Sequence, residues 1–138
     1  MDRCVLLHVE DDDGAAFLFR AALDEAEITA SVYRMADPES AIQFLRKTGH
    51  YERARTPRLI VVDLTLPGRD GWWLLRQIQQ DPGLQSIPVV VVSFEPSAQI
   101  APKAIAAGAH AYIEKPFDFG VYVEQVKTVC SPILASSS

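Results

Sequence analysis

Residues 58–71 read RLIVVDLTLPGRDG, and this stretch decides which fold the rest of the chain can adopt. Its apolar run, residues 59–62, is short and rich in β-branched side chains, as is typical of a strand buried on both faces. The run ends on Asp63, and a charge at the end of a buried strand is costly unless another group meets it. Proline and glycine then turn the chain, and Asp70 is placed to cap a following helix. Because ligands of open α/β sheets gather at the carboxyl ends of the strands, Asp63 is either a site residue or a simple turn aspartate.

Four more short apolar runs predict strands, and segments with helical periodicity separate them. The strands are expected at Cys4–Val9, Thr29–Tyr33, Leu59–Asp63, Pro88–Ser93 and Ala109–Glu114. The helices are expected from about Asp13 to Ala26, Asp37 to Gly49, Asp70 to Asp81, Pro102 to Ala107 and Asp118 to Cys130. A proline deeper inside a helix would cost about 3 kcal/mol, so Pro102 should begin its helix after a long, loosely held loop.

Strand and helix alternate five times along the chain, without internal repeats. Alternation of this kind builds a parallel sheet with helices on both faces, joined by right-handed crossovers. We therefore predict an α/β fold, a five-stranded doubly wound domain at residues 1–130, followed by a tail at residues 131–138 that frays.

The composition is that of an ordinary globular domain and argues against several classes of protein. Of 138 residues, 49% are hydrophobic and 22% charged, which is enough for one hydrophobic core. The net charge of -5 argues against general affinity for nucleic acid. Cys4 and Cys130 form no disulfide framework or zinc pattern. No run is long enough to span a membrane and the acidic N-terminus is not a secretory signal, so we expect a cytoplasmic protein.

Polar side chains stand at the ends of four of the predicted strands. They are Glu10, Asp11 and Asp12 after the first strand, Asp63 on the third, Ser93 on the fourth and Lys115 after the last. These ends share one edge of a parallel sheet, where two carboxylates ~4 Å apart repel by roughly 4 kcal/mol at an effective dielectric of 20. A lysine or a metal must neutralise such a cluster, and oxygen ligands favour Mg²⁺. Mg²⁺ and a lysine also suit a phosphoryl group, for which Asp63 would be the nucleophile, giving an acyl phosphate.

Four motifs together resemble those of response-regulator receiver domains. They are Val9-Glu10-Asp11-Asp12, Asp63-Leu64-Thr65-Leu66-Pro67-Gly68-Arg69-Asp70-Gly71, Ser93 after a valine run, and Tyr112-Ile113-Glu114-Lys115-Pro116-Phe117. The resemblance spans about Cys4 to Cys130. It implies a flavodoxin-like fold with strand order 2-1-3-4-5, and a cis bond between Lys115 and Pro116.

The resemblance also implies a role for each residue of the phosphorylation site. Asp63 is expected to be the phosphorylated residue, and Ser93 and Lys115 to contact the phosphoryl group. Tyr112 is expected to be an aromatic switch that turns inward when Ser93 is drawn toward the phosphoryl group, which shifts the population between two packings.

The same resemblance implies a Mg²⁺ site. Asp11 and Asp63 would be direct ligands together with the carbonyl of Thr65, while Glu10 would act mostly through water. Asp12 is expected only to solvate the loop or to cap the first helix.

One residue departs from the pattern of the family. A small residue usually follows the serine or threonine of the fourth strand, but this chain has Phe94 there. We expect Phe94 to point partly outward and to slow the entry of phosphodonors. Glu95 lies where the family tunes the access of hydrolytic water.

The last predicted helix carries more apolar surface than one sheet requires. Its two stripes are Val123, Val126 and Cys130, and Phe119, Tyr122, Val126 and Val129. The surplus predicts either a larger core contact or a protein interface on the face of the last two helices and the last strand. A homodimer would be the simplest result of such an interface.

The motifs therefore predict a stand-alone response regulator of a two-component system or phosphorelay, which takes its phosphoryl group from a histidine kinase or a phosphotransfer protein. It would be no enzyme beyond catalysing its own phosphorylation and dephosphorylation. The acids 10–12 and the long connection from Gly49 to Pro57 are similar to those of small regulators paired with bacterial phytochrome kinases.

Three other functions fit parts of the pattern. A degenerate receiver would act as a docking module, without phosphorylation. A phosphohydrolase could use Asp63 as its nucleophile, but such enzymes need a second acid two residues later, where this chain has Thr65. A nucleotide- or flavin-binding module would need glycine and hydroxyl residues after the first strand, where this chain has acids.

Overall fold

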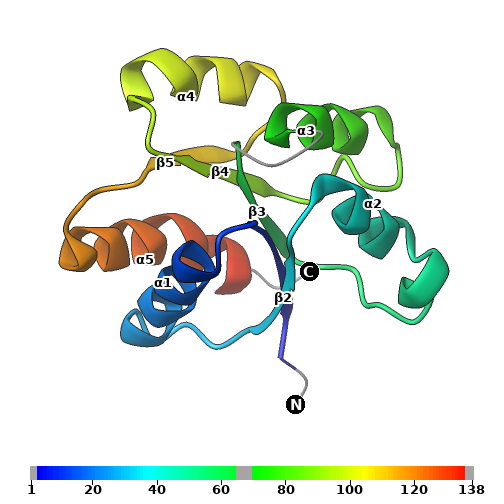
Figure 1. Cartoon of the computed structure of the whole chain (residues 1–138), viewed down its shortest axis with the longest axis horizontal. Helices are drawn as coiled ribbons and strands as arrows, with labels where there is room; N and C mark the ends of the chain where they lie inside the picture. The colour runs from blue at the N-terminus through cyan, green and yellow to red at the C-terminus, as the bar shows by residue number, and fades with distance from the viewer. Residues whose placement is uncertain (1–2, 65–69, 136–138) are drawn as a thin grey trace.

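The computed structural model describes residues 3–64 and 70–135, which form five strands, five α-helices and one 3₁₀ turn (Figure 1). The strands are β1 (Val5–Val9), β2 (Ser31–Met35), β3 (Leu59–Asp63), β4 (Val89–Ser93) and β5 (Ala111–Glu114). The helices are α1 (Asp13–Glu25), α2 (Pro38–Arg46), α3 (Gly71–Gln80), α4 (Ser97–Ala106) and α5 (Phe119–Ala135), with η1 (Gly49–Tyr51) after α2. None of these helices is long and apolar enough to cross a membrane.

The strands form one parallel sheet in the order β2-β1-β3-β4-β5, so the predicted doubly wound topology is confirmed. Helices α1 and α5 cover one face, and α2, α3 and α4 cover the other (Figure 1). The strand order reverses between β1 and β3, and the helices that follow these two strands leave on opposite faces. In open α/β sheets a crevice for ligands opens at this point, outside the carboxyl ends of the strands.

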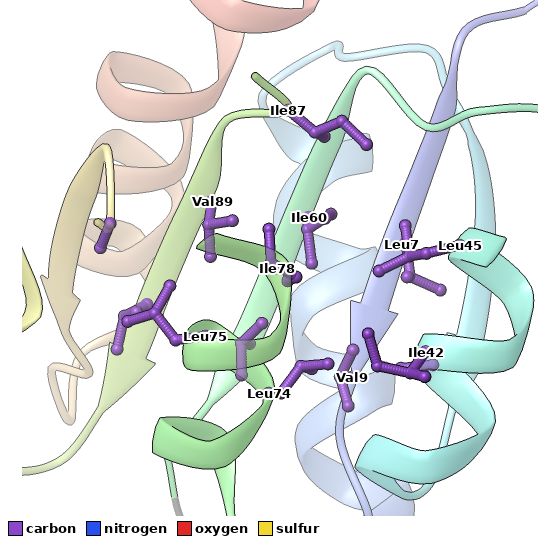
Figure 2. Packing of buried hydrophobic residues seen from close by; sticks show 14 of the residues in the cluster. Leu7, Val9, Ile42, Leu45, Ile60, Leu74, Leu75, Ile78, Ile87 and Val89 are labelled. Atoms are coloured by element: carbon purple, nitrogen blue, oxygen red, sulfur yellow. The ribbon is translucent and has the colours of Figure 1, made fainter. Parts of the chain in front are cut away.

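Both faces of the sheet are buried, which explains why the central strands are apolar without alternation. In β3, Ile60 lies on the side of the sheet covered by α3, near Ile78 (Figure 2), and Val62 belongs to the same buried cluster. The alternate residues of the same strand belong to the second cluster, with α1 and α5. Burying one such side chain stabilises the fold by roughly 1.5–3 kcal/mol, so this core holds the strand ends in place.

Aspartates cap the helices that leave the sheet edge. The side chains of Asp12, Asp37, Asp70 and Asp118 each accept a hydrogen bond from a backbone N–H three residues later. The caps therefore begin α1, α2, α3 and α5 where the sequence predicts them, and they fix the loops around the strand ends.

The predicted long loop after β4 is wrong. Helix α4 begins at Ser97, and Pro102 lies inside it. Its first turn is held from outside, because the Ser97 N–H donates to Glu114 Oε1 at 2.7 Å. Ile100 and Ala104 are buried against the sheet. These tertiary contacts offset the backbone hydrogen bond that Pro102 cannot make.

The chain also differs from the prediction near its C-terminus. Residues 131–135, which the sequence predicts to fray, continue α5, because Leu134 is buried and its carbonyl accepts a hydrogen bond from Arg58 Nη1 at 3.0 Å. Residues 136–138 lie outside the described part of the chain. On the first turns of α5, Tyr122 is buried, so it belongs to the core rather than to a surface stripe.

The predicted cis bond before Pro116 is wrong, since the described residues contain no cis peptide bond. The trans form of a bond before proline is favoured by about 0.5–1 kcal/mol. Lys115 reaches the carboxylates at the sheet edge with its bond to Pro116 in this form.

Candidate functional site

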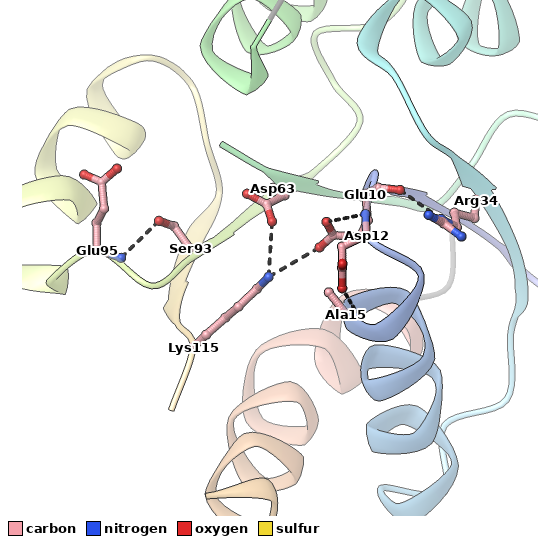
Figure 3. Close-up of polar contacts among 8 residues, drawn as sticks. All are labelled: Glu10, Asp12, Ala15, Arg34, Asp63, Ser93, Glu95 and Lys115. Carbon is pink, nitrogen blue, oxygen red and sulfur yellow. Dashed lines mark hydrogen bonds and ion pairs between the residues drawn. The ribbon is translucent and has the colours of Figure 1, made fainter. Parts of the chain in front are cut away.

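Four strand ends bring polar side chains together at one edge of the sheet, as the sequence predicts (Figure 3). Asp63 ends β3 and Ser93 ends β4. Glu10 follows β1, where its backbone N–H donates to the carbonyl of Met35. Lys115 follows β5, and its N–H continues the sheet by donating to the carbonyl of Ser93 at 2.7 Å. The backbone of the sheet therefore fixes the position from which each side chain of the site extends.

The ammonium of Lys115 joins the two acids of the site. Its Nζ lies 3.1 Å from Asp63 Oδ2 and 3.3 Å from Glu10 Oε1 (Figure 3). The three side chains are only 12%, 13% and 3% exposed, respectively. Ion pairs this well shielded from water hold their geometry much more firmly than surface pairs do.

The pKa of Glu10 is raised from 4.5 to about 7. Burial is the main cause, the charge of Asp63 adds to it, and the ammonium of Lys115 opposes both. When Glu10 and Asp63 are both ionised, their negative charge exceeds the single positive charge of Lys115. An added cation with a preference for oxygen ligands would be favoured here, so these residues fit Mg²⁺.

The third predicted acid does not join this cluster. Asp11 is exposed beside Glu10, and the described residues contain no group of three His, Cys, Asp or Glu side chains arranged to hold a metal ion. Thr65, whose carbonyl the resemblance assigns to the metal, lies outside the described residues.

The loop between β1 and α1 is held by a residue that the sequence analysis missed. Arg34 Nε donates to the carbonyl of Glu10 at 2.8 Å (Figure 3). Its Nη1 lies 2.6 Å from Asp13 Oδ1. Asp12 caps α1 by accepting from the N–H of Ala15 at 2.7 Å, which confirms its predicted capping role. In the sequence, the only sign of this role is that an arginine lies near the end of a short edge strand. The residues that Arg34 contacts are distant in the chain, so the role could not be predicted from local sequence.

Ser93 and Tyr112 both hold the turn between β4 and α4. The Ser93 Oγ accepts from the N–H of Glu95 at 3.1 Å, and the Tyr112 hydroxyl donates to the carbonyl of Glu95 at 2.6 Å. Partial burial raises the pKa of Tyr112, so its hydroxyl stays a donor at neutral pH. The two predicted switch partners are therefore linked through one residue.

Phe94 points outward, as the sequence predicts, with 62% of the residue exposed. Its ring stacks on that of Phe117, with 6.0 Å between centroids and 24° between planes. The Nζ of Lys115 lies 5.1 Å from the centroid of the Phe94 ring. The residue that departs from the family pattern thus contacts the lysine of the site.

His8 lies beneath the site on β1, where it is buried against the ring of Phe19 with 4.3 Å between centroids. Burial, and then the charge of Lys115, lower its pKa to about 3, so the imidazole is neutral. It adds no charge to the carboxylates above it.

A comparison with models of known protein families shows which family has this fold. Residues 6–127 match the model of the response regulator receiver domain. The chain belongs to this family. Membership of this family accounts for the topology of the sheet.

Curated relatives of this receiver domain are regulators. Rcp1 of Synechocystis sp. is a response regulator that is 38% identical over 89 residues, or 64% of this chain and 60% of Rcp1. The matched part of the chain therefore spans less than two thirds of that relative. The probable methanogenesis regulatory protein FilR2 of Methanothrix harundinacea is 32% identical over 86% of this chain and 76% of its own length.

Two solved structures resemble the whole receiver domain. The phosphorylated cyanobacterial phytochrome response regulator RcpA is 29% identical and has a TM-score of 0.87, covering 100% of this chain and 98% of that one. The Mn²⁺-bound form of Rcp1 is also 29% identical and has a TM-score of 0.85, covering 98% and 97%.

Proposed function

We propose that this receiver domain accepts a phosphoryl group on Asp63. The observation that carries the proposal is the shielded ion pair between Asp63 and Lys115, with Glu10 on the same ammonium. A phosphoryl group on Asp63 would bring its oxygens to the position where Lys115 already donates. The ammonium would then stabilise the charge that develops on these oxygens during transfer.

Mg²⁺ would be held by Glu10 and Asp63 together with Asp11, which is exposed outside their cluster in this structure and would have to turn inward. The carbonyl of Thr65 is a further expected ligand. When bound, the ion neutralises charge on the phosphoryl oxygens. The raised pKa of Glu10 supports this assignment, because a divalent cation would remove the cost of ionising it. The Mn²⁺-bound form of Rcp1 supports a divalent ion in a relative of the same fold.

Ser93 and Tyr112 would carry the signal away from the site. The Ser93 hydroxyl, which accepts from Glu95 here, would turn to donate to the phosphoryl group. That turn would release Glu95, the residue whose carbonyl Tyr112 holds. Phosphorylation would then shift the population of the β4–α4 turn and of the face made by α4, β5 and α5.

The donor would be a histidine kinase or a phosphotransfer protein, and the chain would act as a stand-alone response regulator in the cytoplasm. The likeness to the cyanobacterial phytochrome response regulator RcpA supports a bacterial phytochrome kinase as the partner. No interaction with nucleic acid or membrane is proposed. A homodimer through the α4-β5-α5 face is supported by exposed apolar residues, which are Ile105, Phe119 and Val121.

Labelling with acetyl phosphate tests the central claim. Wild-type protein with Mg²⁺ should gain the mass of one phosphoryl group, and EDTA should abolish the gain. The variant Asp63→Asn should stay unlabelled, whereas Asp12→Asn, which alters a neighbouring acid that only caps α1, should be labelled like the wild type. A wild type that no donor labels would leave a docking module that works without phosphorylation.

A further inference from the structure

The outer edge of the sheet carries a hollow that the proposed phosphorylation site does not use. It lies beside β2, the edge strand, and has a volume of about 390 Å³. Side chains of β2, α2, η1 and the connection that follows η1 line it. Ligand pockets in proteins start at about 300 Å³, so this hollow can take a small ligand. Its chemistry is set by three rings and three basic side chains, which are Tyr33, Phe44, Tyr51, His50, Arg53 and Arg55.

The three aromatic rings that line the hollow contact one another through Phe44. The centroid of the Phe44 ring lies 5.5 Å from that of Tyr33 and 5.6 Å from that of Tyr51. Phe44 is buried and anchors the group, whereas Tyr33 is 46% exposed. Edge strands are usually protected by charged side chains, so a large exposed ring in the middle of β2 is not explained by protection of the edge. Tyr33 offers a flat surface on which a planar ligand can stack.

The charged side chains that line the hollow are all of one sign. Arg53 and His50 are exposed, and Arg55 is positioned by a hydrogen bond of 2.9 Å from its Nη2 to the carbonyl of Arg3. No aspartate or glutamate is found among the described residues that line the hollow. In a chain with a net charge of -5, this local arrangement favours an anionic ligand over a cationic one. Arginine in particular suits phosphate, because its guanidinium can donate two parallel hydrogen bonds.

We propose that this hollow binds a free mononucleotide, with the base stacked on Tyr33 and the phosphate held by Arg53 and Arg55. A nucleotide joins a planar ring to a phosphate within the size of one such hollow. Its phosphate carries nearly two negative charges at neutral pH, which suits two arginines better than the single charge of a carboxylate. The hollow includes no residue of the phosphorylation site, so the proposal does not rest on the function of Asp63.

The test separates the two halves of the ligand. Titrations followed by NMR measure the binding of AMP, of adenosine and of inorganic phosphate. AMP should bind with a Kd on the order of 0.1–1 mM, and about tenfold more tightly than either of its parts, because only AMP engages the ring and the arginines together. The shifted signals should lie in β2, α2 and residues 49–55. Added salt should weaken the binding of AMP but not that of adenosine, since the arginines act on an exposed charge.

Two variants each remove one half of the proposed site. Tyr33→Ala should weaken the binding of AMP by about tenfold, and Arg53→Ala by roughly three- to tenfold. Arg53 lies on an exposed connection, so this variant should fold even if Tyr33→Ala loosens β2, and thermal melting checks both. Phe17→Ala removes an exposed ring from α1, and Arg76→Ala removes an exposed arginine from α3. These two controls should leave the affinity for AMP unchanged.

The outcomes also distinguish this site from the phosphorylation site. Asp63→Asn should bind AMP like the wild type, and a loss of binding in that variant overturns the proposal. Adenosine or inorganic phosphate that binds as tightly as AMP does the same, because one half of the ligand would then suffice. No shift at AMP concentrations up to about 10 mM also overturns it. A short oligoadenylate that binds more than about tenfold more tightly than AMP would replace the free nucleotide by a nucleic-acid strand.

Discussion

Gly71 lies so close to Asp63 that a Cβ at residue 71 would sit 2.5 Å from the Asp63 carbonyl oxygen. The same Cβ would be 2.8 Å from the Cα of Leu64. Both neighbours are backbone atoms, which cannot move aside without shifting the end of β3. Gly71, the first residue of α3, therefore fixes the position of Asp63 at the end of β3.

The variant Gly71→Ala should accordingly be destabilised by about 1–3 kcal/mol, the usual cost of overpacking a filled position. Urea unfolding measures this loss. Gly120→Ala is the matched control, because its Cβ would meet only the side chain of Asp118 at 3.2 Å, and its stability should change by less than about 1 kcal/mol. Equal stabilities for the two variants would show that β3 can shift freely.

The sequence predicts features that depend on neighbouring residues and misses those that depend on residues distant along the chain. The central strands, the parallel sheet covered on both faces and the capping role of Asp70 depend on local patterns and on general rules of α/β folds, so they are predicted correctly. The strand order, also correct, is implied only by the resemblance to receiver domains. The strand ends place Asp63 and Lys115 together for the same reason.

The errors arise where a distant partner overrides a local rule. Pro102 predicts a helix start, but a hydrogen bond from the backbone N–H of Ser97 to the carboxylate of Glu114 begins α4 earlier. The end of α5 depends on Arg58, which lies 76 residues before the carbonyl that it holds. Arg34 is another such case, since its partners are Glu10, in the loop after β1, and Asp13, the first residue of α1, which the pairing of β1 with β2 brings near.

The raised pKa of Glu10 predicts that stability depends on pH. Between pH 4.5 and about 7, the folded protein keeps a proton on Glu10 that the unfolded chain has lost. The free energy of unfolding should therefore fall as pH rises through this range. The stabilising contribution of protonated Glu10 should be full below pH 4.5 and lost above pH 7. The size of the fall is on the order of 3 kcal/mol.

The wild type alone cannot isolate the effect of Glu10, because His8 changes the stability with pH in the opposite direction. Its pKa is lowered from 6.5 to about 3, so its contribution to stability is full above pH 6.5 and lost as pH falls. Urea unfolding of the wild type and of Glu10→Gln in EDTA isolates the term of Glu10. The wild type should lose stability relative to this variant as pH rises from 4.5 to 7. A constant difference between the two proteins would contradict the raised pKa.

The proposed dimer face predicts an effect of charge on the exposed side of α5. Val121 is 47% exposed there, while Tyr122 beside it is buried. If α5 pairs with a second copy, Val121→Arg should shift the protein toward the monomer in sedimentation velocity, because a charge would be buried without a partner. Phe17→Arg on α1 should leave the sedimentation unchanged. A wild type that sediments as a monomer at every concentration would rule out the dimer.

Tyr112 should stabilise the β4–α4 turn through its hydroxyl alone. The hydroxyl donates to the carbonyl of Glu95 at 2.6 Å, while Ser93 accepts from the N–H of the same residue, so the turn is held on both sides. In Tyr112→Phe the ring remains and one hydrogen bond is lost. The cost in global stability should be at most about 1 kcal/mol, because water can reach the freed carbonyl. Amide exchange of Phe94, Glu95 and Ser97 should nevertheless become faster, since the local opening of the turn no longer breaks that bond.

Hydrogen exchange followed by NMR measures this effect residue by residue. Tyr33→Phe, which removes a hydroxyl from a tyrosine on β2 at the far edge of the sheet, should leave exchange of these three amides unchanged. Faster exchange confined to the turn would show that Tyr112 holds Glu95 before any phosphoryl group arrives. Unchanged exchange would mean that Ser93 and the first turn of α4 suffice, and Tyr112 would then have no hold on Glu95 to release when Ser93 turns.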